Sequence, residues 1–206
     1  MKKVVGIVQL MAGNGRSVAR GLDLLGVESI QIEDENSLSQ CTHIVLPGVA
    51  SFGAVVDELH AKKLFNPIKK LYGGKVRVIG LCAGMQIMGE ESNENPGIKG
   101  LGWFDYKCVE ITNNEGTRKF HTGWNSVEMN GTKNILSASK DFSYYFNHSY
   151  FVPPTEKKFE QIGVTRYFGS EITSIFLQEN IVGVQFHPEK SQRAGIAILK
   201  NFVDWC

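Results

Sequence analysis

The fold is decided by residues 76–86, which read VRVIGLCAGMQ. The apolar run at 76–82 is typical of a strand that is buried on both faces of a parallel sheet. Gly80 and Gly84 stand two residues before and after Cys82. This is the spacing of a nucleophile elbow, because the sharp turn from strand to helix leaves no room for side chains there. A thiolate is favoured at the start of a helix, so we predict that Cys82 is a nucleophile rather than a core thiol.

Strand-like and helix-like segments alternate through the rest of the N-terminal half. Apolar runs predict strands at 3–10, 28–32 and 43–49. Between and after them, apolar residues at helical spacing predict a helix capped by Asn14 and a second helix over 52–64. Alternation of this kind produces an α/β fold, an open and mostly parallel sheet with helices on both faces.

The segment from about 100 to 180 has a different pattern. Short alternating stretches such as 107–112 and 173–177 predict strands. Turn signals separate them at Asn113-Asn114, Asn130-Gly131, Pro153-Pro154 and Glu179-Asn180. We expect antiparallel strands along one edge of the parallel sheet, followed by a closing helix over 194–205. No linker-like stretch or repeat interrupts the chain, so we expect a single domain spanning residues 1–206.

The composition excludes several classes of function. The 206 residues carry 22 Lys and Arg against 21 Asp and Glu, a formal net charge of +1. Charge this balanced argues against binding to nucleic acid or to an anionic membrane surface. The apolar runs are too short for a membrane span or a signal peptide, so we expect a cytoplasmic protein. The four cysteines lie far apart and form no C-x-x-C pair, so the sequence suggests neither a zinc site nor a disulfide scaffold. We expect no metal and no cofactor.

A thiol nucleophile needs a base, and His187 is the strongest of the five histidines. It follows the apolar run at 181–186, and Glu189 stands two residues further on. Residues at this spacing share a face of an extended chain, so the carboxylate can orient the imidazole as the third member of a triad. A simple turn with a solvated Glu-Lys pair is the alternative. We expect structural roles for His43, within a strand, and for His60, on a helix.

These segments are similar to the motifs of the class I, triad-type glutamine amidotransferases: G-x-C-x-G-x-Q at 80–86 and F-H-P-E at 186–189. Within that family, three further segments resemble the glutaminase subunits of imidazole glycerol phosphate synthases. They are PGV at 47–49, HTGWN at 121–125 and HPEKSQ at 187–192. The resemblance runs from about Val4 to Phe202 and implies a flavodoxin-like fold.

The resemblance implies hydrolysis of L-glutamine to glutamate and ammonia by acyl transfer. Cys82 is then the nucleophile that attacks the side-chain carbonyl, His187 transfers the protons and Glu189 orients its ring. The backbone N–H groups of Val49 and Ala83 match the positions of the oxyanion hole.

The resemblance also implies a pocket for the glutamine substrate. Gln86 matches a residue that helps to hold glutamine, and the backbone of His148, Ser149 and Tyr150 matches the segment that faces its α-amino and carboxylate groups. Gly48 allows its turn to reorient. In the resembling enzymes this turn completes the oxyanion hole only when the partner subunit holds its own substrate. Without the resemblance, Gln86 reads as a polar residue on a helix face and the other three as a strand edge.

Ammonia is easily lost to water and protonation, so such glutaminases dock on a synthase and deliver ammonia through a channel. The resemblance implies a heterodimer with a (β/α)8-barrel synthase (cyclase) subunit, which makes imidazole glycerol phosphate in histidine biosynthesis. The positions that match the docking face are Asn14, Trp124, Asn125, Tyr145 and Lys190. Aromatic residues are common at interface centres, although Trp124 is also compatible with a core position.

Two departures from the family pattern bear on the choice of partner. The family shows Asp-Tyr-Gly-x-Gly-Asn where residues 9–14 read Gln-Leu-Met-Ala-Gly-Asn, and Ala50 replaces a glycine of the oxyanion turn. A related glutaminase that feeds a different synthase in surface-sugar (lipopolysaccharide) biosynthesis is therefore an open alternative. A stand-alone thiol hydrolase is disfavoured by Gln86 and by 121–125, and a silent binding subunit is disfavoured by the intact triad.

Overall fold

The structure is a computed structural model that describes residues 3–11, 13–112, 117, 119–130, 143–154 and 159–205. Some features of the sequence analysis lie wholly or partly outside these residues: the turn signals at 113–114 and 130–131, Ala12 in the altered loop, and Cys206. Across the described residues, no helix is both long enough and apolar enough to cross a membrane.

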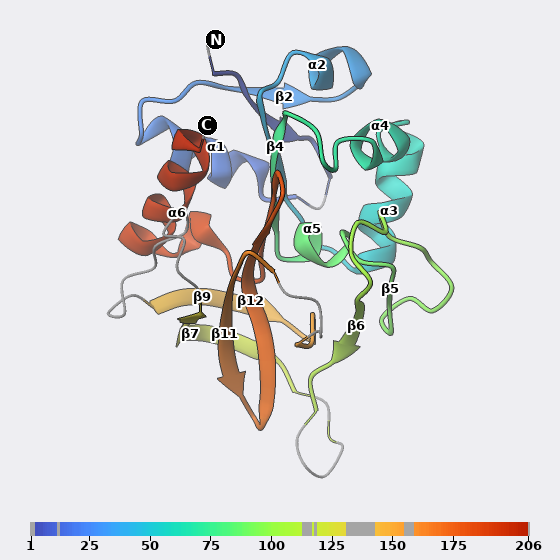
Figure 1. Cartoon of the computed structure of the whole chain (residues 1–206), viewed down its shortest axis with the longest axis vertical. Coiled ribbons are helices and arrows are strands. Elements are labelled where there is room, and N and C mark those ends of the chain that lie inside the picture. The colour runs from blue at the N-terminus through green and yellow to red at the C-terminus, as the bar shows by residue number, and fades with distance from the viewer. Residues whose placement is uncertain are drawn as a thin grey trace.

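Within the described residues, eight strands form the main sheet in the order β2-β1-β3-β4-β13-β12-β11-β8 (Figure 1). The strands from β2 to β13 run parallel. Their bounds are β1 (Val5–Val8), β2 (Ser29–Ile32), β3 (His43–Leu46), β4 (Arg77–Leu81) and β13 (Ile181–Val184). Every residue of β1, β3 and β13 is buried, which is why these strands read as continuous apolar runs.

Antiparallel strands extend the sheet beyond β13, as the sequence predicted. They are β12 (Ser170–Gln178), β11 (Gln161–Tyr167) and β8 (Glu128–Asn130). The predicted turn at Glu179-Asn180 joins β12 to β13, with Glu179 in the left-handed region at φ 56°. The expected fold class, a mostly parallel α/β sheet with an antiparallel extension, is confirmed.

Helices cover both faces of the sheet (Figure 1). One face carries α1 (Gly15–Asp23) and α6 (Gln192–Asp204), and the other carries α3 (Phe52–Ala61), α4 (Phe65–Lys69) and α5 (Ala83–Gln86). A short helix, α2 (Glu35–Ser39), follows β2. Successive residues of β4 point to opposite faces, so Ile79 belongs to the core beneath Val18 of α1 and Val78 to the core beneath Leu59 of α3.

Smaller sheets lie beside the carboxyl ends of the parallel strands. β7 (His121–Ser126) pairs antiparallel with β9 (Ser143–His148). β6 (Lys107–Glu110), predicted from the alternation at 107–112, pairs with β5 (Glu91–Ser92) and with β10 (Tyr150–Phe151). These pairings place the 121–125 and 148–150 segments next to each other.

Three local predictions were wrong in detail. The strand predicted over 43–49 ends at Leu46, because Pro47 has no N–H for the ladder. The helix predicted over 52–64 ends at Ala61, and Lys63 adopts φ 58° before α4 begins. Asn14 stands at the N-cap of α1, but its side chain makes no capping hydrogen bond. That side chain has a different partner, described below.

Candidate active site

The elbow at Cys82 has the geometry that the paired glycines predicted. Cys82 joins β4 to α5 at φ 52° and ψ −110°, a combination that a residue with a side chain rarely adopts. A Cβ atom on Gly84 would lie 1.9 Å from the carbonyl oxygen of Leu46, and one on Gly80 would lie 2.6 Å from the carbonyl oxygen of Gly84. Only glycine fits at both positions, so the chain can turn sharply and present the thiol.

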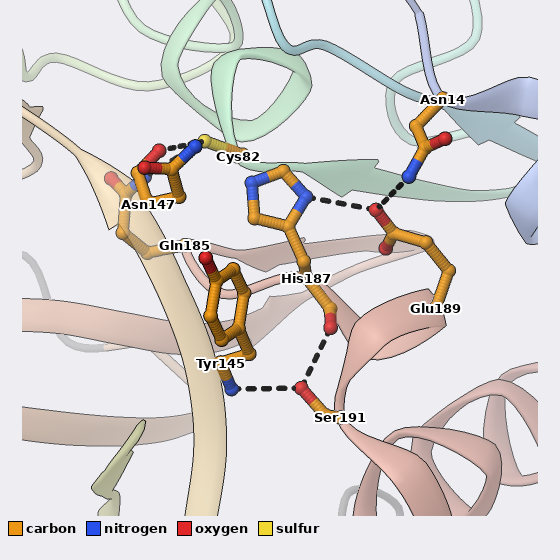
Figure 2. Close-up of polar contacts among 8 residues, drawn as sticks. All are labelled: Asn14, Cys82, Tyr145, Asn147, Gln185, His187, Glu189 and Ser191. Carbon is orange, nitrogen blue, oxygen red and sulfur yellow. Dashed lines mark hydrogen bonds and ion pairs between the residues drawn. The ribbon is translucent and has the colours of Figure 1, made fainter. Parts of the chain in front are cut away.

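His187 and Glu189 form a buried pair directly after β13. Nδ1 of His187 lies 2.9 Å from Oε1 of Glu189, and the two side chains are 2% and 1% exposed. His187 and Cys82 line the same pocket, and Figure 2 shows the imidazole lying between Cys82 and Glu189. The structure therefore brings together the three residues that the sequence predicted as a triad.

The electrostatics of this pair favour a charged imidazole. Burial lowers the pKa of His187, but the charge and hydrogen bond of Cys82 and then those of Glu189 outweigh it and raise the pKa to about 10. Burial raises the pKa of Glu189, whereas the hydrogen bond and charge of His187 and a hydrogen bond from Asn14 bring it below the ordinary value. The buried imidazolium of His187 therefore lies between two groups that stabilise its charge, Cys82 on one side and the carboxylate of Glu189 on the other.

Asn14 holds the carboxylate of the triad from the far end of the chain. Its Nδ2 donates to Oε1 of Glu189 at 3.0 Å (Figure 2). The sequence analysis assigned Asn14 to a helix cap and to the docking face, and it missed this contact. The retained Gly-Asn at 13–14 was the available signal, but the partner lies 175 positions away in sequence.

Ser191 holds the loop at 187–191, which carries His187 and Glu189, against β9. Sequence reasoning missed this residue. Its Oγ donates to the carbonyl oxygen of His187 at 2.6 Å and accepts from the backbone N–H of Tyr145 at 2.9 Å. The N–H of His187 donates in turn to the carbonyl oxygen of Tyr145 at 2.8 Å. Both the N–H and the carbonyl of His187 are therefore held, and Figure 2 shows the two hydrogen bonds of Ser191.

A pocket of about 290 Å³ opens beside the thiol. Its lining includes most of the predicted site residues, namely Val49, Cys82, Ala83, Gln86, His148, Ser149, Tyr150 and His187. Sequence reasoning missed Glu94, Phe120 and Asn147, which also line it. Among the lining residues that the structure describes, Glu94 is the only carboxylate, and its Oε2 accepts from the backbone N–H of Phe52 at 2.8 Å.

Two buried glutamines connect the nucleophile to the pocket wall. Gln86 donates through Nε2 to the carbonyl oxygen of Tyr150 at 2.7 Å and to Oε1 of Gln185 at 3.2 Å. Nε2 of Gln185 then donates to Sγ of Cys82 at 3.6 Å. Sequence reasoning missed Gln185, although a glutamine inside the apolar run at 181–186 was a visible anomaly. Gln86 was predicted to hold substrate, and in the structure its side chain contacts Gln185, a neighbour of the thiol.

The turn before α3 closes over the elbow. The backbone N–H of Ala83 donates to the carbonyl oxygen of Gly48 at 3.4 Å. A Cβ atom on Gly48 would lie 2.7 Å from Cβ of Ala83 and from the backbone nitrogen of Gly84. Glycine is therefore required at position 48 for this close approach, and in this structure the turn presents a carbonyl to the predicted oxyanion donor.

The sequence matches a known protein family over most of its length. The profile of the family described as glutamine amidotransferase class-I matches residues 7–205. The chain belongs to this family. The expected enzyme class, a glutamine amidotransferase, is thereby confirmed.

Curated relatives of this amidotransferase carry the name that the resemblance pointed to. Those from Methanocaldococcus jannaschii and Pyrococcus furiosus are each called imidazole glycerol phosphate synthase subunit HisH. The first is 38% identical over 202 residues, covering 98% of this chain and 99% of the relative. The second is 39% identical over 199 residues, covering 96% and 97%. The predicted resemblance to these subunits is confirmed.

Solved structures show the same fold at low sequence identity. A crystal structure of a glutamine amidotransferase superposes with a TM-score of 0.73 at 17% identity, covering 97% of this chain and 96% of that one. The structure of PurLQS from Thermotoga maritima superposes with a TM-score of 0.75 at 18% identity, covering 100% and 99%.

In this amidotransferase, three of the five predicted docking residues form one cluster. The rings of Trp124 and Tyr145 meet edge to face with centroids 6.0 Å apart, and Nζ of Lys190 lies 5.6 Å from the centroid of the Tyr145 ring. Trp124 is 50% exposed, which rules out the alternative of a core position. Asn125 joins a hydrogen-bonded chain beside the pocket, and the Asn14 side chain contacts Glu189.

Proposed function

We propose that the chain hydrolyses L-glutamine to glutamate and ammonia and passes the ammonia to a (β/α)8-barrel synthase partner that makes imidazole glycerol phosphate in histidine biosynthesis. The single observation that carries the hydrolysis is the buried set of Cys82, His187 and Glu189, with the first two on one pocket wall. The names of the relatives support the pathway. The family match over residues 7–205 supports one amidotransferase domain spanning residues 1–206.

The proposed reaction has two halves. In the first, the Cys82 thiolate attacks the side-chain carbonyl carbon of glutamine, and the carbon–nitrogen bond then breaks as His187 gives its proton to the departing ammonia. This leaves a γ-glutamyl thioester on Cys82. In the second half, neutral His187 takes a proton from water, the resulting hydroxide attacks the thioester, and the carbon–sulfur bond breaks to release glutamate. Glu189 keeps the imidazole in the orientation that both steps need.

Substrate recognition is assigned to the pocket wall. The carboxylate of Glu94 suits the α-ammonium group of glutamine, because a buried positive charge needs a negative partner. The backbone of His148, Ser149 and Tyr150 suits the α-carboxylate and α-amino groups, and Gln86 shapes the floor beside the thiol. Gly48 gives the adjacent turn its close approach to the elbow.

The oxyanion hole is proposed to need a rearrangement. Ala83 and Val49 are the donors expected for the developing negative charge, and the Gly48 carbonyl occupies the Ala83 donor in this structure. Withdrawal of that carbonyl exposes the donor. The partner subunit, when it holds its acceptor, is proposed to favour the rearranged turn, and this coupling suppresses wasteful hydrolysis by the free chain.

The docking face is proposed to be the exposed cluster of Trp124, Tyr145 and Lys190. Trp124 lies on β7, Tyr145 on β9 and Lys190 three residues after His187, so a partner seated there contacts the loop that carries the proposed base. Trp and Tyr are common at the centres of interfaces.

The experiment is to mix the purified chain with the histidine-pathway barrel and, separately, with the barrel of the surface-sugar synthase, each with and without its acceptor. We expect the histidine-pathway barrel to stimulate glutamate release and to form imidazole glycerol phosphate from glutamine. Stimulation by the surface-sugar barrel alone would transfer the protein to the alternative pathway. Hydrolysis of other amides or peptides, with no effect of either barrel, would indicate a stand-alone thiol hydrolase.

A further inference from the structure

Two buried histidines that the triad does not use lie in contact beside the pocket. His121 on β7 faces His148 on β9, with 3.1 Å between Nδ1 of His121 and Nε2 of His148. Burial lowers the pKa of His121 to about 4. Burial, followed by the charge of His121, lowers the pKa of His148 to about 3. Both rings are therefore neutral near pH 7, and each carries a single N–H.

The outer end of this pair is fixed by Asn125. Its Oδ1 accepts from the backbone N–H of Ser126 at 2.8 Å, so the amide nitrogen faces the other way. Nδ2 then donates to the carbonyl oxygen of Arg166 and to Nε2 of His121, both at 3.4 Å. Because Nε2 of His121 accepts, the proton of this neutral ring must be on Nδ1.

The inner end of the pair leads to the same assignment. Nδ1 of His148 lies 2.9 Å from the carbonyl oxygen of Tyr150, which can only accept, so a neutral His148 ring that keeps this hydrogen bond carries its proton on Nδ1. Nε2 of His148 is then free to accept from Nδ1–H of His121. The contact of Asn125 with His121 and the contact of Tyr150 with His148 therefore imply the same positions for the ring protons of both histidines.

The series of hydrogen bonds from Asn125 to Tyr150 ends on groups that shape the proposed substrate pocket. The carbonyl oxygen of Tyr150 accepts from His148 and also from Nε2 of Gln86, at 2.7 Å. His148, Tyr150 and Gln86 all line the pocket, whereas His121 and Asn125 do not. The hydrogen bonds of the two residues outside the pocket reach its wall through His148.

We propose that His121, held by Asn125, is a positioning residue for glutamine binding: it fixes His148 as the Nδ1–H tautomer and thereby holds the Tyr150 carbonyl and the Gln86 amide in place. This inference rests on the proposed glutaminase function. The competing explanation is that the ring only fills space, since it stacks on Phe146 and Tyr167 with centroids 4.3 Å and 4.1 Å away.

Two variants of His121 separate the hydrogen bond from the ring. His121→Phe keeps a ring between Phe146 and Tyr167 but has no N–H for His148, whereas His121→Asn loses the ring and keeps an amide donor near the position of Nδ1. In the full chain with its barrel partner, we expect His121→Phe to raise KM for glutamine about tenfold while kcat changes less than about threefold. We expect His121→Asn to restore most of the wild-type KM.

A matched control is His60→Phe, which makes the same change at an exposed histidine on α3 that stacks on Phe65 and does not line the pocket. KM is expected to stay unchanged in this variant. A similar rise in KM for His60→Phe and His121→Phe would show that the effect is not specific to the chain of hydrogen bonds, and would overturn the proposal.

Nitrogen-15 NMR of the histidine rings gives a readout that is independent of turnover. We expect His148 to be the Nδ1–H tautomer in the wild type and in His121→Asn, and to populate both tautomers in His121→Phe. An unchanged KM and tautomer in His121→Phe would overturn the proposal, as would a larger rise in KM for His121→Asn than for His121→Phe. A wild-type chain that hydrolyses no glutamine would instead reject the proposed function, and the NMR measurement would still test the chain of hydrogen bonds.

Discussion

The carbonyl oxygen of Gly48 accepts a hydrogen bond from the backbone N–H of Ala83 at 3.4 Å. The same N–H is the expected donor to the oxyanion, so the resting geometry leaves this donor already occupied. Under the proposed function, rotation of the single peptide between Gly48 and Val49 would withdraw the carbonyl and turn the Val49 N–H toward the elbow. The proposal thus requires a change of only one peptide plane to complete the oxyanion hole.

This relationship predicts that the free chain is slow and that an acceptor-loaded partner activates it. One missing oxyanion donor costs about 10²–10³ in rate, so we expect glutamate release to rise by at least this factor when the barrel and its acceptor are both added. Glutamate production under saturating glutamine is the measurement. A free chain that already turns over at the full rate, unchanged by either barrel, would refute the gating.

Cys82 is predicted to be the reactive thiol. Cys82→Ala should abolish glutamine hydrolysis without weakening docking to the barrel, because the side chain is small and lies in the pocket, outside the cluster of Trp124, Tyr145 and Lys190. Mass spectrometry after treatment with a thiol-alkylating glutamine analogue should find the label on Cys82. Cys41 and Cys108 are buried, and burial raises the pKa of each thiol, to about 11 for Cys41. Label on either of these with Cys82 untouched would contradict the assignment.

Substitutions of His187, Glu189 and Asn14 are predicted to lower activity, with the largest loss at His187 and the smallest at Asn14. His187→Asn removes the proton carrier and is expected to lower kcat by a factor of about 10⁴ or more. Glu189→Gln is expected to lower kcat by a factor that is about 10² times smaller, since the imidazole remains. Asn14→Leu removes one hydrogen bond to a buried carboxylate and is expected to cost about tenfold. Steady-state kinetics of the complex tests the order. Near-normal turnover in His187→Asn would require a different base.

Acid is predicted to destabilise the fold through the neutral histidine pair. The folded-state pKa values of His121 and His148, about 4 and about 3, lie below the ordinary value of 6.5. Below pH 6.5 the unfolded chain therefore binds more protons than the folded chain, so the free energy of unfolding falls as pH falls from 6.5 toward 4. Each imidazole contributes a loss of up to about 1.4 kcal/mol per pH unit in this window.

Urea unfolding at pH 7, 6 and 5 measures this dependence. His121→Phe removes one of the two titrating groups. The slope of its unfolding free energy against pH should therefore be shallower than that of the wild type by up to about 1.4 kcal/mol per pH unit, which corresponds to one proton. The difference between the two proteins cancels the carboxylates that titrate in both. Identical slopes would mean that His121 is charged in the folded state.

Trp124 is predicted to anchor the partner. Trp124→Ala removes a half-exposed indole from the cluster with Tyr145 and Lys190, and we expect it to weaken Kd for the barrel by about 2 kcal/mol or more, roughly 30-fold. Leu24→Ala is the control, because Leu24 is 78% exposed and lies at the end of α1, outside this cluster. Calorimetric titration of the barrel checks both, and equal Kd values for wild type and Trp124→Ala would remove this face from the interface.

Local pattern was sufficient for much of the fold. The apolar runs predicted β1, β3, β4 and the alternation with helices, because a strand buried on both faces has to be apolar at every position. Boundaries were less accurate where one residue overrode the periodicity. Lys63, at φ 58°, ends the segment that hydrophobic spacing alone continued to Leu64.

The sequence by itself determined the elbow at Cys82 and the pair of His187 and Glu189, because both follow from residues within a few positions of each other and from short-range sterics. Only the tertiary structure decided that Asn14 holds Glu189 across 175 positions, and that His121 meets His148. These contacts depend on which strands become neighbours and on how the helices pack over them. That choice is made by the burial of two whole cores rather than by the propensity of any short segment.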